Sequence, residues 1–292
     1  MSAPWLMVLA SLLFATMGAC VKVAATQYGS AEIVFYRGLI GAGLIVLVVR
    51  WRGGTLRTRL AGAHLWRSLT GVTALCLWFF ALGHLPLATA MTLNYMSSVW
   101  MALFLVGAAL MLGRGQVDTR TIATVLLGFV GVVLILRPTV ERQQLWHGLM
   151  GLLSGMVSAT AYLQIAALGR AGEPEYRIVF YFSLGGIVAG ALLASGLGWH
   201  AHTATGIVLL FAVGLLATVA QLLMTRAYAI GRPLVNACLQ YLGIAFSFGF
   251  GVLLFDDPVS WSALGGMALV VVAGVQAARL RGAAHPALPS PD

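Results

Sequence analysis

Residues 33–41 read IVFYRGLIG, and residues 178–186 read IVFYFSLGG. The second stretch begins 145 positions after the first, in a chain of 292 residues. Repetition of an apolar phrase at half the length of a chain indicates an internal repeat. The sequence therefore predicts two halves that fold alike.

The composition places both halves in a lipid bilayer. Apolar residues make up 60% of the chain and charged residues only 9%, whereas a soluble domain carries about 25% charged residues. The net charge of +9 comes from arginines between apolar runs, which indicates membrane topology rather than nucleic-acid binding. The three cysteines fall inside apolar segments without metal-ligand spacing, and we interpret them as small buried residues: Cys20, Cys76 and Cys238.

Ten apolar runs are long enough to cross the hydrocarbon core, which takes about 20 helical residues. We expect an all-α integral membrane protein with ten transmembrane helices, in which neighbours along the chain pack as antiparallel pairs. The first run is expected to be a retained helix rather than a signal peptide. The ten runs cover about residues 4–27, 31–50, 67–84, 87–112, 119–137, 146–170, 176–197, 205–228, 233–255 and 260–280.

The loop arginines predict the orientation, because arginine is retained on the cytoplasmic side of membrane proteins. With the N-terminus inside, two loop arginines fall outside, Arg137 and Arg142. Thirteen fall on the cytoplasmic side: Arg50, Arg52, Arg57, Arg59, Arg67, Arg114, Arg120, Arg170, Arg177, Arg226, Arg232, Arg279 and Arg281. Both termini are therefore expected in the cytoplasm.

The repeat lies in the second and the seventh span, and other positions support the same period. Leu93-Asn94-Tyr95-Met96 in the fourth span resembles Leu239-Gln240-Tyr241-Leu242 in the ninth. Five is an odd number, so the second half must enter the membrane from the opposite face. We expect two inverted five-helix repeats, residues 1–140 and 141–282, followed by a disordered cytoplasmic tail, residues 283–292. Secondary transporters use this arrangement for alternating access, with the substrate at the midplane between the repeats.

Several residues carry a resemblance to a known family. They are Lys22 late in the first span, Tyr36-Arg37-Gly38 in the second, the Leu85-Pro86 turn before the fourth, and Gly128 and Gly131 in the fifth. Together with ten spans in a five-plus-five pattern, they resemble the EamA-type branch of the drug/metabolite transporter superfamily, over about residues 4–281. The resemblance implies a bacterial-type inner-membrane exporter of small metabolites, frequently amino acids or related compounds.

The resemblance has a finer part and two departures. Asn94-Tyr95 and the aromatic residues after it are similar to the aromatic-amino-acid exporters of the family (YddG-like). Ser97 stands where the family often has a proline, and Arg114 stands where it has a glutamate. A kink in the fourth span and an acidic contact after it are therefore not implied here.

Polar and aromatic residues near the middle of the spans are candidates for a substrate pocket, because a polar group facing lipid is costly. Asn94, Ser97 and Ser98 share one helix face. The predicted substrate-binding residues are Trp78, Asn94, Tyr95, Ser98, Trp100, Ser158, Tyr162, Gln221, Gln240 and Tyr241. The alternative is that such residues only bridge packed helices.

Three charged residues are expected at one depth near the outer ends of the first two spans: Lys22, Glu32 and Arg37. They predict an electropositive site or outer gate that attracts carboxylates. The alternative is that both cations reach the surface and pair with Glu32.

No aspartate or glutamate falls in the interior of any predicted span. Proton-coupled export of organic cations normally requires such a carboxylate, so we expect a neutral, zwitterionic or anionic cargo instead. No metal site or cofactor is predicted, since the histidines lack a third ligand nearby. An intramembrane enzyme and a channel remain alternatives to a carrier. The expected partners are a small-molecule substrate and the bilayer, without nucleic acid, and the expected state is a monomer.

Overall fold

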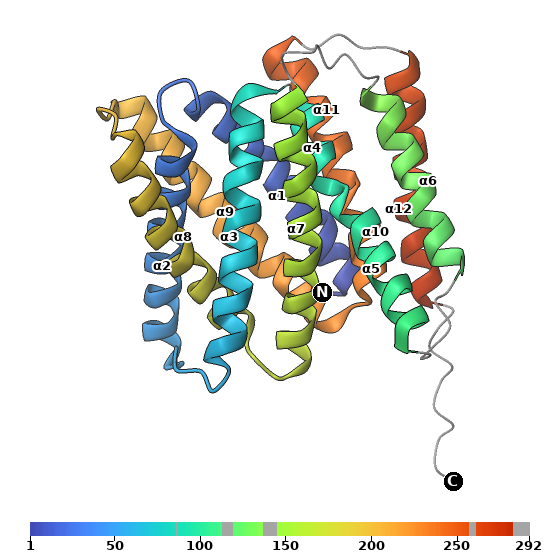
Figure 1. The fold of residues 1–292 in the computed structure, drawn as a ribbon, viewed down its shortest axis with the longest axis horizontal. Helices are drawn as coiled ribbons and strands as arrows, with labels where there is room; N and C mark the ends of the chain where they lie inside the picture. The colour runs from blue at the N-terminus through green and yellow to red at the C-terminus, as the bar shows by residue number, and fades with distance from the viewer. Residues whose placement is uncertain (86, 113–118, 137–144, 257–260, 283–292) are drawn as a thin grey trace.

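The computed structural model describes residues 1–85, 87–112, 119–136, 145–256 and 261–282, and the regular structure in these ranges is helical. The helices form one bundle (Figure 1). They are α1 (Ala3–Ala24), α2 (Ser30–Arg52), α3 (Ala61–His84), α4 (Leu87–Tyr95), α5 (Ser97–Leu112), α6 (Thr119–Leu136), α7 (Leu145–Arg170), α8 (Glu175–Leu197), α9 (Ala204–Ile230), α10 (Pro233–Gln240), α11 (Leu242–Phe255) and α12 (Trp261–Gly282).

Within the described residues, seven helical segments are long and apolar enough to cross a membrane. They are Ala3–Ala24, Ser30–Arg52, Ala61–His84, Trp146–Arg170, Glu175–Leu197, Ala204–Ile230 and Val235–Phe255. Shorter apolar segments lie in α6 and α12. Large apolar side chains such as Leu192 and Val208 are exposed on the outer faces of the bundle, as expected of surfaces that contact lipid.

Two of the predicted spans are each divided into two helices. The span expected at about 87–112 breaks at Met96, between α4 and α5, and the span expected at about 233–255 breaks at Tyr241, between α10 and α11. The first break occurs although Ser97, and no proline, stands beside it. Here α7 approaches the broken backbone closely: a Cβ atom on Gly155 would lie far inside van der Waals contact of the Leu93 carbonyl oxygen.

Sequence neighbours were expected to pack as antiparallel pairs, but they supply only minor contacts. The most extensive contacts join helices that are far apart in the sequence: α2 with α8, α1 with α9, α3 with α7, and α6 with α12. Glycines explain the closest of these pairs. Gly38 faces the backbone of Ser183 and Ile187 on α8, while Gly190 faces the backbone of Phe35 on α2. Short loops connect neighbouring helices, but small residues decide which helix surfaces can approach each other.

The connections gather at two ends of the bundle (Figure 1). The α2–α3 and α7–α8 connections lie at one end, here named the α2–α3 end, and the α1–α2 and α8–α9 connections lie at the other, the α1–α2 end. One expected loop arginine is placed differently. Because α3 begins at Ala61 rather than near residue 67, Arg67 lies inside the helix and is only 3% exposed. The predicted tail at 283–292 and the sequence signals at Pro86, Arg114, Arg137 and Arg142 lie outside the described residues.

A polar cavity at the centre of the bundle as the candidate functional site

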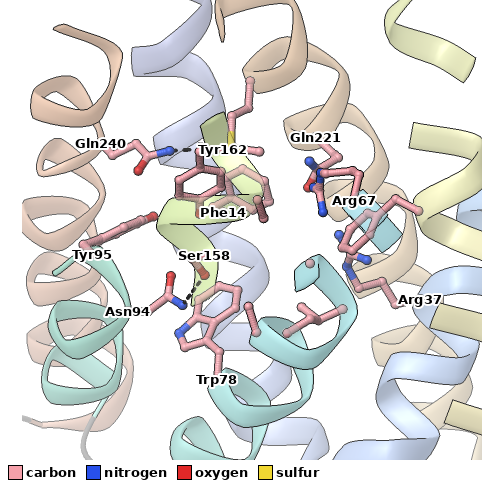
Figure 2. Close-up of a pocket in the computed structure, with 16 residues that line it drawn as sticks. Phe14, Arg37, Arg67, Trp78, Asn94, Tyr95, Ser158, Tyr162, Gln221 and Gln240 are labelled. Carbon is pink, nitrogen blue, oxygen red and sulfur yellow. Dashed lines mark hydrogen bonds between the residues drawn. The ribbon is translucent and has the colours of Figure 1, made fainter. Parts of the chain in front are cut away.

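A cavity lies between helices of both halves of the chain (Figure 2). Its free volume of about 50 Å³ accommodates a few water molecules. The lining residues are Phe14, Arg37, Arg67, Gly71, Ala74, Leu75, Trp78, Asn94, Tyr95, Ser158, Ala161, Tyr162, Phe182, Gln221, Met224 and Gln240.

Hydroxyl and amide groups form one side of the cavity. Asn94 lies one residue before the end of the short helix α4 and is 4% exposed. Its Nδ2 donates hydrogen bonds to Ser154 Oγ at 3.1 Å and to Ser158 Oγ at 3.3 Å, both on α7. These bonds join α4 to α7 directly beside the helix break, so a movement of α4 would also move this wall of the cavity.

Tyr162, one turn further along α7, lies above this group and connects α7 to α9 and α10. Its hydroxyl is hydrogen-bonded to Ser158 and to Gln240, the last residue of α10 (Figure 2). The Tyr162 ring stacks on Tyr228 of α9 at a centroid distance of 5.4 Å. The Nε2 of Gln240 also lies 3.6 Å from the Met224 sulfur, while its Oε1 is buried without a hydrogen-bond partner. The amide oxygen is therefore an unused acceptor at the cavity.

Two arginines form the opposite side of the cavity (Figure 2). Arg37 on α2 is 5% exposed and Arg67 on α3 is 3% exposed. Both guanidinium groups lie on the ring of Phe182 in α8, with Cζ at 5.0 Å and 4.3 Å from its centroid. Cation–π contacts of this kind stabilise a desolvated cation by about 2 kcal/mol, far less than the cost of burying an unpaired charge.

Gly71 allows Arg67 to fold back along its own helix. A Cβ atom on Gly71 would lie far inside van der Waals contact of Arg67 Nη1 and 3.0 Å from Phe182 Cε2. The absence of a side chain at position 71 thus makes the space that the guanidinium occupies. The site depends on a glycine one turn after the arginine.

Most of the predicted substrate-binding residues line this one cavity: Trp78, Asn94, Tyr95, Ser158, Tyr162, Gln221 and Gln240. Three others lie outside its lining. Ser98 Oγ donates to the Ala237 carbonyl at 2.8 Å, Tyr241 is fully buried against α6, and Trp100 packs beside Phe104. The contacts of Ser98 and Tyr241 join helices, whereas Trp100 and Phe104 lie on the same helix α5.

The three residues expected at an outer gate do not form one group. Arg37 lines the central cavity. Lys22 Nζ donates to the Leu85 carbonyl at 3.0 Å, near the ring of Phe255. Glu32 is paired with His200 at 2.5 Å and accepts from the Gly29 backbone N–H. The Glu32 carboxylate therefore fastens the α8–α9 connection to α2 at the α1–α2 end.

A second polar cluster fastens the α2–α3 end. Glu173, in the α7–α8 connection, accepts from Thr58 at 2.8 Å and pairs with Arg177 at 2.9 Å and His64 at 3.3 Å. Burial alone would raise the pKa of the Glu173 carboxyl, but the hydrogen bonds from Thr58, Arg177 and His64 together hold this pKa below its ordinary value. The carboxylate is thus stabilised in its charged form.

Sequence reasoning missed eight lining residues: Phe14, Arg67, Gly71, Ala74, Leu75, Ala161, Phe182 and Met224. Arg67 was interpreted as a loop residue because other arginines precede it. The position of Phe182 was available from the repeat, since Arg37 and Phe182 occupy equivalent places in IVFYRGLIG and IVFYFSLGG. Phe14 and Met224 carry no signal that separates them from ordinary apolar residues of a span. Among the described residues, no group of three histidine, cysteine or acidic side chains is placed to hold a metal ion.

Apolar helices around a buried polar cavity are typical of a multi-pass membrane transporter, and comparisons with known proteins identify its family. The model of the EamA-like transporter family matches residues 1–137. The pseudopaline exporter CntI of Pseudomonas aeruginosa is 32% identical over 280 residues, which cover 94% of this chain and 95% of the relative. A riboflavin transporter of Brucella anthropi is 26% identical to this chain, and the match covers 92% of this chain and 95% of the relative. A solved crystal structure shares the fold, with a TM-score of 0.78 over 97% of this chain and 99% of that one, at 18% identity.

The chain belongs to the EamA-like transporter family of the drug/metabolite transporter superfamily. It is a multi-pass membrane transporter and not an enzyme, as the resemblance in the sequence implied.

Proposed function

We propose that this transporter exports small metabolites across a bacterial-type inner membrane by alternating access. The cargo would bind in the central cavity, on Trp78, Asn94, Tyr95 and the other lining residues that the sequence predicted. The observation that carries this proposal is the composition of the cavity wall: helices from both halves of the chain contribute polar side chains that have no role on a lipid-facing surface.

Two inverted five-helix repeats, residues 1–140 and 141–282, are part of the proposal. Exchanging the halves turns the α1–α9 pair into the α7–α3 pair and leaves α2–α8 and α6–α12 unchanged, so the main packed pairs fit a two-fold relation. The breaks at Met96 and Tyr241 are separated by 145 residues, the same distance as the two quoted stretches. A count of ten membrane crossings treats α4 with α5 as one crossing and α10 with α11 as another.

Contacts of the repeated helices support the same relation. Glu32 on α2 binds His200 in the α8–α9 connection. At the positions 145 residues removed from these two, Arg177 on α8 binds the carbonyl of Thr55 in the α2–α3 connection. Equivalent residues thus fasten equivalent loops at opposite ends of the bundle, which an inverted repeat requires.

Charge supports an orientation with the α2–α3 end in the cytoplasm. The connections at this end carry exposed arginines such as Arg57 and Arg59, while the described connections of the α1–α2 end carry none. Both termini would then be cytoplasmic. Fusion of a reporter to each terminus tests this arrangement, since an odd number of crossings would place the two reporters on different sides.

The cargo is proposed to be an amino acid or a related compound. Amide and hydroxyl groups at Asn94, Ser158 and Gln240 suit polar groups of a solute, and the rings of Trp78, Tyr95 and Tyr162 suit its apolar body. These rings also make the aromatic amino acids a second, narrower candidate. A relative that is 32% identical is an exporter, which supports export as the direction of transport.

Flux measurements in proteoliposomes test the function. Vesicles containing the purified protein are loaded with amino acids, nucleosides, sugars and choline-like compounds, and release is followed with time. Trp78→Ala and Tyr95→Ala should slow release while leaving insertion unchanged; the matched control is Leu192→Ala, which changes an exposed side chain far from the cavity. Equal flux in all variants would remove the cavity from the pathway. Conductance at the rate of an open ion channel would contradict a carrier, and a chemically altered product would contradict transport without catalysis.

A further inference from the structure

The unsatisfied polar atoms of the cavity describe the molecule that fills it. Four of them are donors: Arg37 Nε, Arg67 Nε, Arg67 Nη1 and Trp78 Nε1, all buried and without a hydrogen-bond partner among the described residues. One is an acceptor, Gln240 Oε1. Buried polar groups are normally hydrogen-bonded, so a ligand that complements this wall is rich in acceptors and carries one donor.

The cavity wall carries a net positive charge, which also favours a ligand rich in acceptors. Two guanidinium groups line the cavity, and no carboxylate is among its lining residues. The four acidic residues of the described chain lie elsewhere. Glu32 is paired with His200, and Glu175 is paired with Arg226. Glu173 is paired with His64 and Arg177. Asp256 is exposed at the end of α11. The two buried cations therefore lack a counter-charge from these groups.

The functional groups are also separated in space. Figure 2 places Arg37, Arg67 and Gln221 on one side of the cavity and Tyr95, Asn94 and Gln240 on the other, with Phe14 and Trp78 between them. A solute that spans the cavity would therefore have an anionic end, a hydrophobic middle and a neutral polar end.

On the basis of the proposed transport function, we propose that the cargo is a small organic anion, in which carboxylates outnumber ammonium groups. A carboxylate binds Arg37 and Arg67, which can each donate two parallel hydrogen bonds to it. An N–H or O–H group at the other end donates to Gln240 Oε1. Within the proposed class of amino acids and related compounds, the pair of arginines thus favours derivatives with a net negative charge over zwitterions and neutral solutes of the same shape.

A matched pair of probes tests the charge requirement without any mutation. N-acetylphenylalanine and its primary amide share a ring and an N–H donor and differ only in the carboxylate. Binding to the purified protein is measured by the rise in the midpoint of thermal unfolding with ligand concentration. We expect the carboxylate to bind roughly tenfold more tightly than the amide or better, the value of a charged hydrogen bond, and phenylalanine to fall between them.

Variants then assign the effect to the arginines. Arg67→Gln and Arg37→Gln keep hydrogen-bonding capacity and remove the charge. The ratio of the affinity for the carboxylate to the affinity for the amide should therefore fall toward one. Arg57→Gln, at an exposed arginine in the α2–α3 connection, is the matched control and should keep the preference.

Equal binding of acid and amide to the wild type, including no binding of either at millimolar concentration, would overturn the proposal. So would a preference that survives both cavity variants. If a variant does not fold, the comparison of acid and amide binding to the wild-type protein still tests the proposal. Saturable flux of a neutral metabolite in the same preparation would leave the proposed transport function standing while excluding an anionic cargo.

Discussion

Replacing Gly38 by alanine should drive apart the two helices that carry the repeated phrase. A Cβ atom at this position would lie 2.7 Å from the Ser183 carbonyl oxygen and 2.9 Å from the Ile187 backbone nitrogen, where ordinary contact begins at 3.4 Å. Both atoms belong to the backbone of α8, so no side-chain rotation can relieve the overlap. The helices must separate by several tenths of an ångström along a tightly packed crossing.

The expected cost follows from this overlap. Inserting a methyl group into a closely packed interior typically costs about 1–3 kcal/mol, although alanine itself favours a helix over glycine by roughly 0.5–1 kcal/mol. Gly43 lies on the same helix, and a methyl group added there would have no atom within 4 Å. Gly43→Ala should therefore be neutral or slightly stabilising. Because the helix-propensity gain is common to both variants, their stabilities should differ by about 1–3 kcal/mol.

The assay is unfolding of both purified variants in the same detergent, followed by intrinsic fluorescence and by the fraction that elutes as a single species. Gly38→Ala should unfold several degrees below wild type, and Gly43→Ala should not. Equal unfolding midpoints for the two variants would refute the close α2–α8 crossing.

Three further changes test other contacts. Gly71→Ala should displace the Arg67 guanidinium and weaken binding of N-acetylphenylalanine about tenfold, without loss of stability. Gly62→Ala on the same helix, where an added Cβ atom has nothing within 4 Å, should leave both Arg67 and the binding unchanged. Identical binding by the two variants would contradict the placement of Arg67. Glu173→Gln should destabilise the protein at neutral pH, because each hydrogen bond to a charged group contributes about 1.5–3 kcal/mol. Because the pKa of Glu173 is lowered in the folded state, its contribution is fully present above the unfolded-state pKa and is lost as the pH falls through the folded value. Unfolding midpoints of wild type and variant should therefore converge in acid, and a constant difference between pH 7 and pH 4 would exclude this role. Asn94→Ala should lower stability by about 1–2 kcal/mol, since two buried hydrogen bonds to α7 are lost; an unchanged unfolding midpoint would show that these bonds contribute nothing.

The sequence was most informative where a polar residue interrupts an apolar helix. Asn94, Ser158 and Gln240 were found because hydrocarbon excludes their side chains, so they must face the interior. The same reasoning selected Ser98, whose hydroxyl instead binds the Ala237 carbonyl. Hydrophobic exclusion distinguishes inside from lipid-facing positions, but it does not distinguish a cavity wall from a helix–helix contact.

Arg67 shows a second limit. An arginine next to a basic loop looks like a topology signal, and only the start of α3 at Ala61 shows that it lies within a helix. The packing partners of the helices were also beyond the sequence, because contacts such as Gly38 with Ser183 depend on shape across 145 residues of separation. The breaks at Met96 and Tyr241 are a third case, since neither position carries a proline or glycine.

The phrase IVFYRGLIG and its copy differ at the fifth letter, where one half supplies a cation and the other the ring beneath it. Two identical halves would offer a solute the same surroundings from either face of the membrane. In the proposed alternating-access cycle, arginine on only one of them would make the inward and outward states hold the solute with unequal strength. Loading and release would then differ in energy.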